Sequence, residues 1–198
     1  HYTYLASKQC PLSKNVQHLA WLDLNTHDGQ EYWMAMNLAG EYAKACHEDI
    51  HRRLAKALGK RIVVTIENHH NFAWKEMVDG KECIVHRKGA TPAAKGQLGI
   101  IPGSMTAPGF IVMGKGNEDS LQSASHGAGR LFSRAKCKAT FTQSQIKKVL
   151  ADNDVTLIGG NIDEAPMAYK NIHTVMNLQT ELVDVLGTFT PKNVRMDR

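Results

Sequence analysis

The sequence predicts an α+β fold, with mixed strands and packed helices in a single domain over residues 1–198. A long segment, 31–58, carries apolar residues at helical spacing. The segments 61–68 and 82–87 are rich in β-branched residues, as strands are. The stretch 98–113 is apolar but interrupted by glycine and proline, which is typical of short buried strands joined by tight loops. One α+β domain is the natural arrangement for this mixture.

The N-terminal part is expected to be a loop-rich lead-in, residues 1–30, followed by one long helix. Thr26 and Asp28 are both candidate caps for the start of that helix. The helix is expected over 31–58, because apolar residues recur at three- and four-residue steps and the opposite face is charged. Gly59 is expected to end it as a C-cap.

The remaining residues, 61–198, are expected to form a catalytic α+β core. The expected strands are 61–68, 82–87 after a turn at 78–80, short strands within 98–113, and 155–160. The expected helices are 131–150, interrupted near Phe141, and 172–186.

Composition sets limits on function without choosing one. The chain has 24 basic and 19 acidic residues, a net charge of +5, which favours anionic partners such as RNA or nucleotides. No apolar run approaches the roughly 20 residues of a membrane helix. The four cysteines are widely spaced and form no CxxC pair, so reduced thiols in a cytoplasm fit better than a disulfide scaffold. Because residue 1 is not methionine, we expect a fragment or a processed product.

Glycine- and histidine-rich loops are the candidates for a functional site. They are residues 67–72, 85–90, 101–105 and 123–130. Each is expected at the end of a strand, where sites are usually built. We therefore expect the four loops to gather in one cleft.

The loop Ser125–Arg130 contains the strongest candidate for chemistry, His126, followed by Gly-Ala-Gly. Glycines allow backbone N–H groups to converge on a phosphate, and a helix expected directly afterwards would favour an anion at its start. Arg130 could add further donors. These are the parts that His126 needs to attack a nucleotide α-phosphate and hold it as a phosphoramidate. The alternative is a histidine that merely caps a tight turn.

Other polar residues in these loops have both a functional and a structural interpretation. His69 and His70 are adjacent, so on a strand at most one of them faces a given site. Arg87, Lys88 and Ser104 could bind phosphate or ribose, or could simply be solvated.

The combination of these loops resembles the RtcB family of RNA ligases. The shared motifs are the His-Asn pair at 70–71, RKGA at 87–90, IPGSM at 101–105, SHGAGR at 125–130 and EAPMAYK at 164–170. The likeness extends from about Tyr32 to the end of the chain.

The resemblance implies a GTP- and Mn²⁺-dependent RNA ligase of tRNA splicing or RNA repair. Such an enzyme joins RNA ends bearing a 2′,3′-cyclic phosphate or 3′-phosphate to 5′-hydroxyl ends through a GMP–histidine intermediate. His126 matches the guanylylated histidine, and His70 matches a metal ligand, for which Mn²⁺ suits mixed imidazole and oxygen donors. The positions that match cofactor-binding residues are Asn71, Lys88, Ser104, Gly127, Ala128, Gly129 and Tyr169.

The chain also departs from the family pattern. Thr106 stands where the family has glycine, Gly109 where it has serine, and Met196-Asp197-Arg198 where it has Val-Lys-Gly. Guanine selectivity is therefore carried over less firmly than the chemistry at His126. The family's N-terminal half supplies further metal ligands that do not occur here, so we expect the missing half as a partner and an incomplete site in these residues alone.

Two different classes of function remain as alternatives. His47-Glu48-Asp49-Ile50-His51 fits the H-E-x-x-H pattern of a zinc metallohydrolase, with His47 and His51 one helical turn apart and Glu48 as base. The chain could instead be an inactive piece that binds RNA or a protein.

Overall fold

The computed structural model describes residues 1–196, in which helices and short sheets mix along the chain, as the α+β prediction requires. It divides into two compact units, His1–Val64 and Thr65–Arg198. The division falls close to residue 61, where the catalytic core was expected to begin. That both units belong to one domain stays a prediction. In the described part of the chain, no helix has the length and apolar character needed to cross a membrane.

The first unit consists of α1 (Tyr2–Gln9), a 3-10 turn (Gln17–Leu19) and the long helix α2 (His27–Ala57). Thr26 caps α2, since its hydroxyl accepts the backbone N–H of Gly29 at 3.2 Å. The helix therefore begins four residues before the predicted start.

The end of α2 agrees with the sequence prediction. Gly59 follows the helix with φ +62°, the left-handed conformation that suits glycine after a helix. Helix α1 was not predicted within the lead-in. It contacts α2 through an edge-to-face pair of rings, Tyr2 and Tyr32, with centroids 5.2 Å apart.

The second unit begins with a long antiparallel hairpin of β1 (Asn71–Val78) and β2 (Lys81–Lys88). Asp79 and Gly80 connect the strands with positive φ angles of 49° and 75°, as a two-residue hairpin turn requires. The predicted turn and the strand at 82–87 are thus confirmed.

The strand predicted at 61–68 is wrong, because these residues form no regular element. Ile62, Val63 and Val64 are exposed and pair with no other strand among the described residues. A β-branched side chain favours a strand only when a neighbouring strand or surface receives it. The partner of β2 is instead β1, whose sequence NFAWKEMV gave a weaker β signal.

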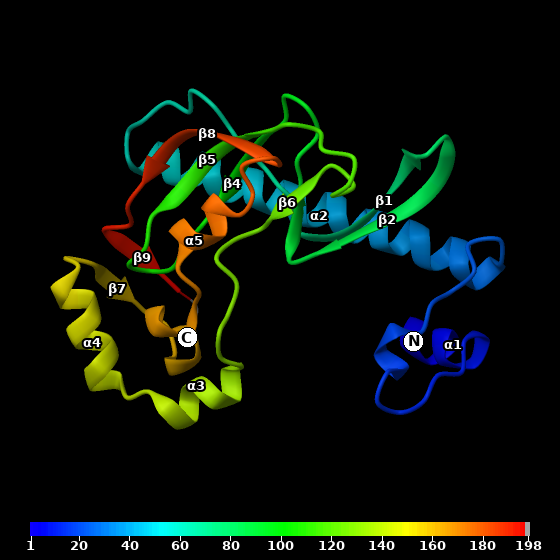
Figure 1. Ribbon diagram of the computed structural model, residues 1–198, viewed down its shortest axis with the longest axis horizontal. Coiled ribbons are helices and arrows are strands. Elements are labelled where there is room, and N and C mark those ends of the chain that lie inside the picture. The colour runs from blue at the N-terminus through cyan, green and yellow to red at the C-terminus, as the bar shows by residue number, and fades with distance from the viewer. Residues whose placement is uncertain (197–198) are drawn as a thin grey trace. The chain divides into compact units, whose positions relative to one another are not determined.

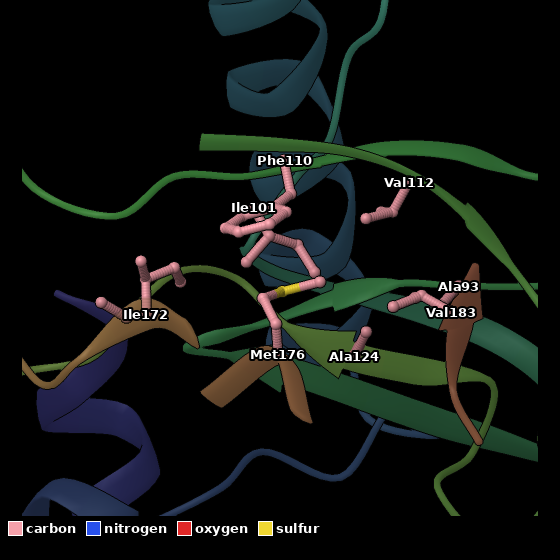
Figure 2. Close-up of a cluster of buried hydrophobic side chains, with 9 residues drawn as sticks. Ala93, Ile101, Phe110, Val112, Ala124, Ile172, Met176 and Val183 are labelled. Carbon is pink, nitrogen blue, oxygen red and sulfur yellow. The ribbon is translucent and has the colours of Figure 1, made fainter. Parts of the chain in front are cut away.

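The centre of this unit is a three-stranded antiparallel sheet of order β4 (Leu98–Ile101), β5 (Gly109–Gly114) and β8 (Val183–Phe189). The short strands predicted within 98–113 are therefore present, as β4 and β5. Helix α5 (Ile172–Asn177) packs against the sheet, and Figure 2 shows Ile101, Phe110 and Met176 meeting from β4, β5 and α5.

The helix predicted over 172–186 is only partly right. It ends at Asn177, and Val183–Phe189 becomes the edge strand β8, paired with β5. The apolar residues of this segment fit a helix and a strand equally well in sequence. The open edge of β5 decides between them, because pairing there satisfies the backbone of both strands.

After the short helix α3 (Arg134–Thr140), a second apolar cluster includes residues of α4 (Gln143–Asp152) and of a parallel strand pair, β7 (Thr156–Ile158) and β9 (Asn193–Arg195). The predicted interruption near Phe141 is confirmed, since Thr142 starts α4 with a capping box to Gln145. The hairpin β1–β2 and helix α4 lie at opposite ends of the second unit (Figure 1).

Candidate functional site

The loop that carries His126 follows β6 (Ser123–Ser125), which pairs with β3 (Ala90–Pro92). Backbone hydrogen bonds fasten it on two sides. The N–H of His126 donates to the Gly89 carbonyl at 3.3 Å, and the N–H of Ala128 donates to the Pro102 carbonyl at 3.0 Å. Three of the four predicted loops therefore meet at His126.

The fourth loop is brought in by His70. Its carbonyl accepts the N–H of Gly89 at 3.1 Å, and its imidazole stacks on that of His126 with centroids 5.3 Å apart and an interplanar angle of 17°. His69 lies against Phe72 instead. His70 therefore faces His126, as expected. The reason is different, however, since both histidines precede β1 and do not lie at the end of a strand.

The surroundings of His70 favour its neutral form. Burial lowers the pKa of its imidazole below the ordinary 6.5, and the nearby His126 and Lys88 lower it further. A hydrogen bond to the backbone of Asn68 acts in the opposite direction. A neutral imidazole with one nitrogen hydrogen-bonded leaves the other nitrogen free to bind a metal.

Asn68 is a residue whose part in this arrangement the sequence did not reveal. Its side-chain oxygen accepts the N–H of Ile100 at 3.2 Å and so fixes the segment before His70 to β4. Its place inside the Glu67–Phe72 loop was the only signal in the sequence.

Of the two ring nitrogens of His126, Nδ1 is buried and has no hydrogen-bond partner. The glycine at 89 adjoins this nitrogen, because a Cβ built there would lie 3.6 Å from Nδ1 and Cε1. A ligand therefore has to approach the ring from the Nε2 side.

The glycines after His126 are required by the fold. A Cβ at Gly127 would lie 3.1 Å from the Pro102 carbonyl oxygen, and Gly129 has φ +71°. The predicted convergence of N–H groups is only partial, since Gly127 donates to Ser125 Oγ at 3.4 Å and Ala128 to Pro102. The helix expected directly after the loop is also wrong, because α3 starts only at Arg134.

Arg130 does not serve as a phosphate fork in this structure. Its guanidinium donates to the Glu164 carboxylate, the Tyr169 hydroxyl, Cys137 Sγ and the Asp163 carbonyl. The donors predicted for phosphate are used within the protein.

Tyr169 belongs to the same network. Its hydroxyl donates to Glu164, and burial together with that carboxylate raises the pKa of the phenol to about 12. Its ring also lies 5.2 Å from the Arg130 guanidinium carbon. The side chain is therefore firmly placed, with its hydroxyl already engaged.

Arg87 is likewise structural, which corrects the alternative of a phosphate- or ribose-binding role. It is 3% exposed and forms a paired hydrogen bond to Glu76 at 2.7 and 2.8 Å. It also donates to Ser123 Oγ, which ties the hairpin to β6. The next residue, Lys88, is exposed and pairs across the hairpin with Asn71, directly beside His70.

Ser104 lies in the loop after β4, where its hydroxyl accepts the N–H of Thr106 at 3.4 Å. The same loop is joined to the His126 loop through Pro102. Ser104 is therefore on a segment that adjoins the site.

The donors for a metal ion are incomplete. Within residues 1–196, no three His, Cys, Asp or Glu side chains are grouped so that they could hold a metal. This applies equally to His47, Glu48 and His51 on α2, so nothing in the structure favours the zinc metallohydrolase alternative. His70 fits a metal as a single neutral imidazole ligand, and the set would need donors from elsewhere.

Comparison with known proteins agrees with the motifs. A family model described as tRNA-splicing ligase RtcB matches residues 1–196. The chain is 50% identical over 123 residues to the RNA-splicing ligase RtcB of Escherichia coli K12, covering 62% of this chain and 30% of that protein. It is 30% identical over 211 residues to the tRNA-splicing ligase RtcB of Methanococcus maripaludis, covering 89% of this chain and 44% of that protein.

The matched region covers 30% and 44% of the length of these two relatives, less than half of each. The family match itself extends over nearly every residue of the chain. The chain therefore belongs to the RtcB family.

Proposed function

We propose that this chain is the catalytic-histidine part of an RNA ligase that joins 2′,3′-cyclic phosphate or 3′-phosphate RNA ends to 5′-hydroxyl ends. The observation that carries the proposal is the stacked pair of His70 and His126, with Nδ1 of His126 buried against Gly89. The family match and the ligase names of the relatives support the same class of reaction.

The first step is nucleotide transfer to His126. Nε2 attacks the α-phosphorus of GTP, an N–P bond forms, and the bond to the leaving pyrophosphate breaks. Attack by Nε2 requires its lone pair, so the remaining ring proton is carried by Nδ1. The nucleotide would approach from the Nε2 side, because Gly89 lies against the Nδ1 edge of the ring.

Mn²⁺, when bound, would neutralise phosphate charge and favour departure of pyrophosphate. From this chain, His70 would supply one neutral imidazole ligand. Lys88, beside His70, would add positive charge near the phosphates. The remaining metal ligands are proposed to come from the N-terminal half of the same ligase, which would be needed for full activity.

The other nucleotide contacts are proposed from the loops that adjoin His126. They are Asn71, Ser104, Gly127, Ala128, Gly129 and Tyr169. Tyr169 would contact the guanosine through its ring, since its hydroxyl is bonded to Glu164. The altered C-terminal residues weaken the case for guanine selectivity, and Asp197 and Arg198 lie outside the described residues. Four free cysteines fit the proposed cytoplasmic location.

The proposal is tested on the protein encoded by the complete open reading frame, incubated with Mn²⁺ and GTP labelled at the α-phosphate. The label should be acid-labile and base-stable, as a phosphoramidate is. His126→Ala should abolish both labelling and joining of 3′-phosphate to 5′-hydroxyl RNA.

Matched controls separate the two histidine roles. His70→Ala should weaken labelling, and a higher Mn²⁺ concentration should partly restore it. His69→Ala, at the neighbouring residue, should leave labelling unchanged. His86→Ala on β2 should retain full activity. Labelling and ligation that persist in His126→Ala would refute the proposal.

A further inference from the structure

Gln179 is one of the few buried polar side chains within residues 1–196, with 5% of its surface exposed. It lies between α5 and β8, far in sequence from the His126 loop. A buried carboxamide is stable only when its donor and acceptor atoms are hydrogen-bonded. Its partners therefore show which parts of the fold it connects.

The acceptor end of Gln179 reaches the residue that precedes His126. Its Oε1 accepts the backbone N–H of Ser125 at 3.0 Å. The neighbouring N–H, that of His126, points to Gly89, and successive N–H groups of an extended strand point to opposite edges. Gln179 thus occupies the edge of β6 that faces away from β3, where a third strand would otherwise bind.

The donor end holds Gln179 itself in place. The side-chain Nε2 donates to Met176 Sδ at 3.2 Å. The backbone carbonyl of Gln179 accepts the N–H groups of Leu182 and Val183 at 3.0 and 3.2 Å. Met176 and Val183 are buried members of the main core cluster. The carboxamide is therefore anchored to the core, and its hydrogen bond holds the backbone of Ser125 in a fixed position relative to that core.

Ser125 passes the constraint on to the loop. Its hydroxyl donates to the Gly127 carbonyl at 2.5 Å and accepts the N–H of the same residue, which closes a tight turn around His126. The backbone that carries the imidazole is thus held by Gly89 on one edge, through the N–H of His126, and by Gln179 on the other, through the N–H of Ser125.

We propose that Gln179 is a positioning residue that fixes the strand end before His126, and thereby the attack geometry of its imidazole. This rests on the proposed function of His126. Loss of the acceptor would leave the Ser125 N–H buried without a partner and let the loop shift. Shifts of about 1 Å in a reacting group can lower rates by up to about a hundredfold.

The test compares Gln179→Met, which keeps the length but removes the acceptor, with Gln179→Glu, which keeps an acceptor oxygen. In the complete protein, Gln179→Met should lower the rate of His126 labelling at saturating GTP about tenfold, with less than about twofold change in the GTP concentration at half-maximal rate. Gln179→Glu should recover most of the rate.

Val183→Ala serves as the control for stability, since Val183 is buried in the same core and its apolar side chain cannot hydrogen-bond to Ser125. It should lower the melting temperature as much as Gln179→Met and leave the labelling rate within about twofold. Equal losses of rate in Val183→Ala, or no recovery in Gln179→Glu, would overturn the proposal.

A second readout does not depend on the ligase reaction. In ¹⁵N spectra of the 198-residue chain, Gln179→Met should speed hydrogen exchange of the Ser125 amide and shift the ring nitrogens of His126, and Val183→Ala should do neither. If wild-type protein does not label while these spectral changes occur, the proposed function fails and the positioning of His126 by Gln179 stands. If the spectra do not change, the positioning role is refuted whatever the labelling.

Discussion

Gly89 lies directly against the imidazole of His126: a Cβ built on it would be 3.6 Å from both Nδ1 and Cε1 of the ring. Gly89 also has φ +73°, donates its N–H to the His70 carbonyl and accepts the N–H of His126 at its own carbonyl. The absence of a side chain at this one residue thus allows both the backbone turn and the close approach of the ring.

Gly89→Ala should therefore have two separable effects. The positive φ should cost about 1–2 kcal/mol of unfolding free energy, and the added methyl group should contact His126 and perturb its NMR signals. Gly80→Ala is the matched control, because Gly80 has φ +75° and a Cβ built on it would meet no other side chain or backbone within 4 Å. Urea unfolding should show similar losses for both variants, with His126 perturbed in Gly89→Ala only. If the NMR signals of the His126 ring were the same in the two variants, the contact between residue 89 and His126 would be contradicted.

The pKa of His70 should be measurably low in metal-free protein. Burial is the main cause, and His126 adds to it, so His126→Ala should raise the pKa of His70 toward its ordinary 6.5. Because the pKa is lower in the folded than in the unfolded chain, the stability that neutral His70 contributes is complete above pH 6.5. It is lost as the pH falls through the folded-state value. An NMR titration of the His70 ring checks both points, and an unchanged His70 midpoint in His126→Ala would count against the stacked pair.

Arg87→Met should strongly destabilise the second unit. It would leave Glu76 without its paired hydrogen bonds and would free the hairpin from Ser123, at a cost of about 3 kcal/mol. On the same hairpin, Glu82 forms only a 3.9 Å exposed pair with Lys75, so Glu82→Ala should cost less than about 0.5 kcal/mol. Urea denaturation measures both. A similar small loss in both variants would mean that the buried pair contributes little.

Tyr169→Phe separates the network role of the hydroxyl from the proposed guanosine contact of the ring. Loss of the hydrogen bond to Glu164 should cost about 1 kcal/mol in stability. The GTP concentration at half-maximal labelling should change little, because the ring remains. Tyr169→Ala should raise that concentration at least several-fold. If Tyr169→Phe raises the GTP concentration at half-maximal labelling as much as Tyr169→Ala does, the hydroxyl and not the ring contacts the nucleotide.

The sequence by itself determined the elements whose signals are local. Thr26 and Gly59 mark the two ends of α2, and Asp79-Gly80 makes the hairpin turn. The break before α4 follows from the cap of that helix at Thr142. These features depend on hydrogen bonds and φ angles within a few residues, which the sequence encodes directly. The glycine- and histidine-rich motifs also pointed to the segments that adjoin His126.

Only the tertiary structure decided which segments pair and where each charged group points. The residues 61–68 have β propensity but find no partner strand in the part of the chain that the structure describes, whereas 183–189 gain one at the edge of β5. Arg87 and Arg130 could have bound phosphate, but their guanidinium groups donate hydrogen bonds to the carboxylates of Glu76 and Glu164. The bond from Gln179 to Ser125 has no local signal at all. Such contacts join residues far apart in sequence, and their energy depends on burial and geometry that exist only once the chain has folded.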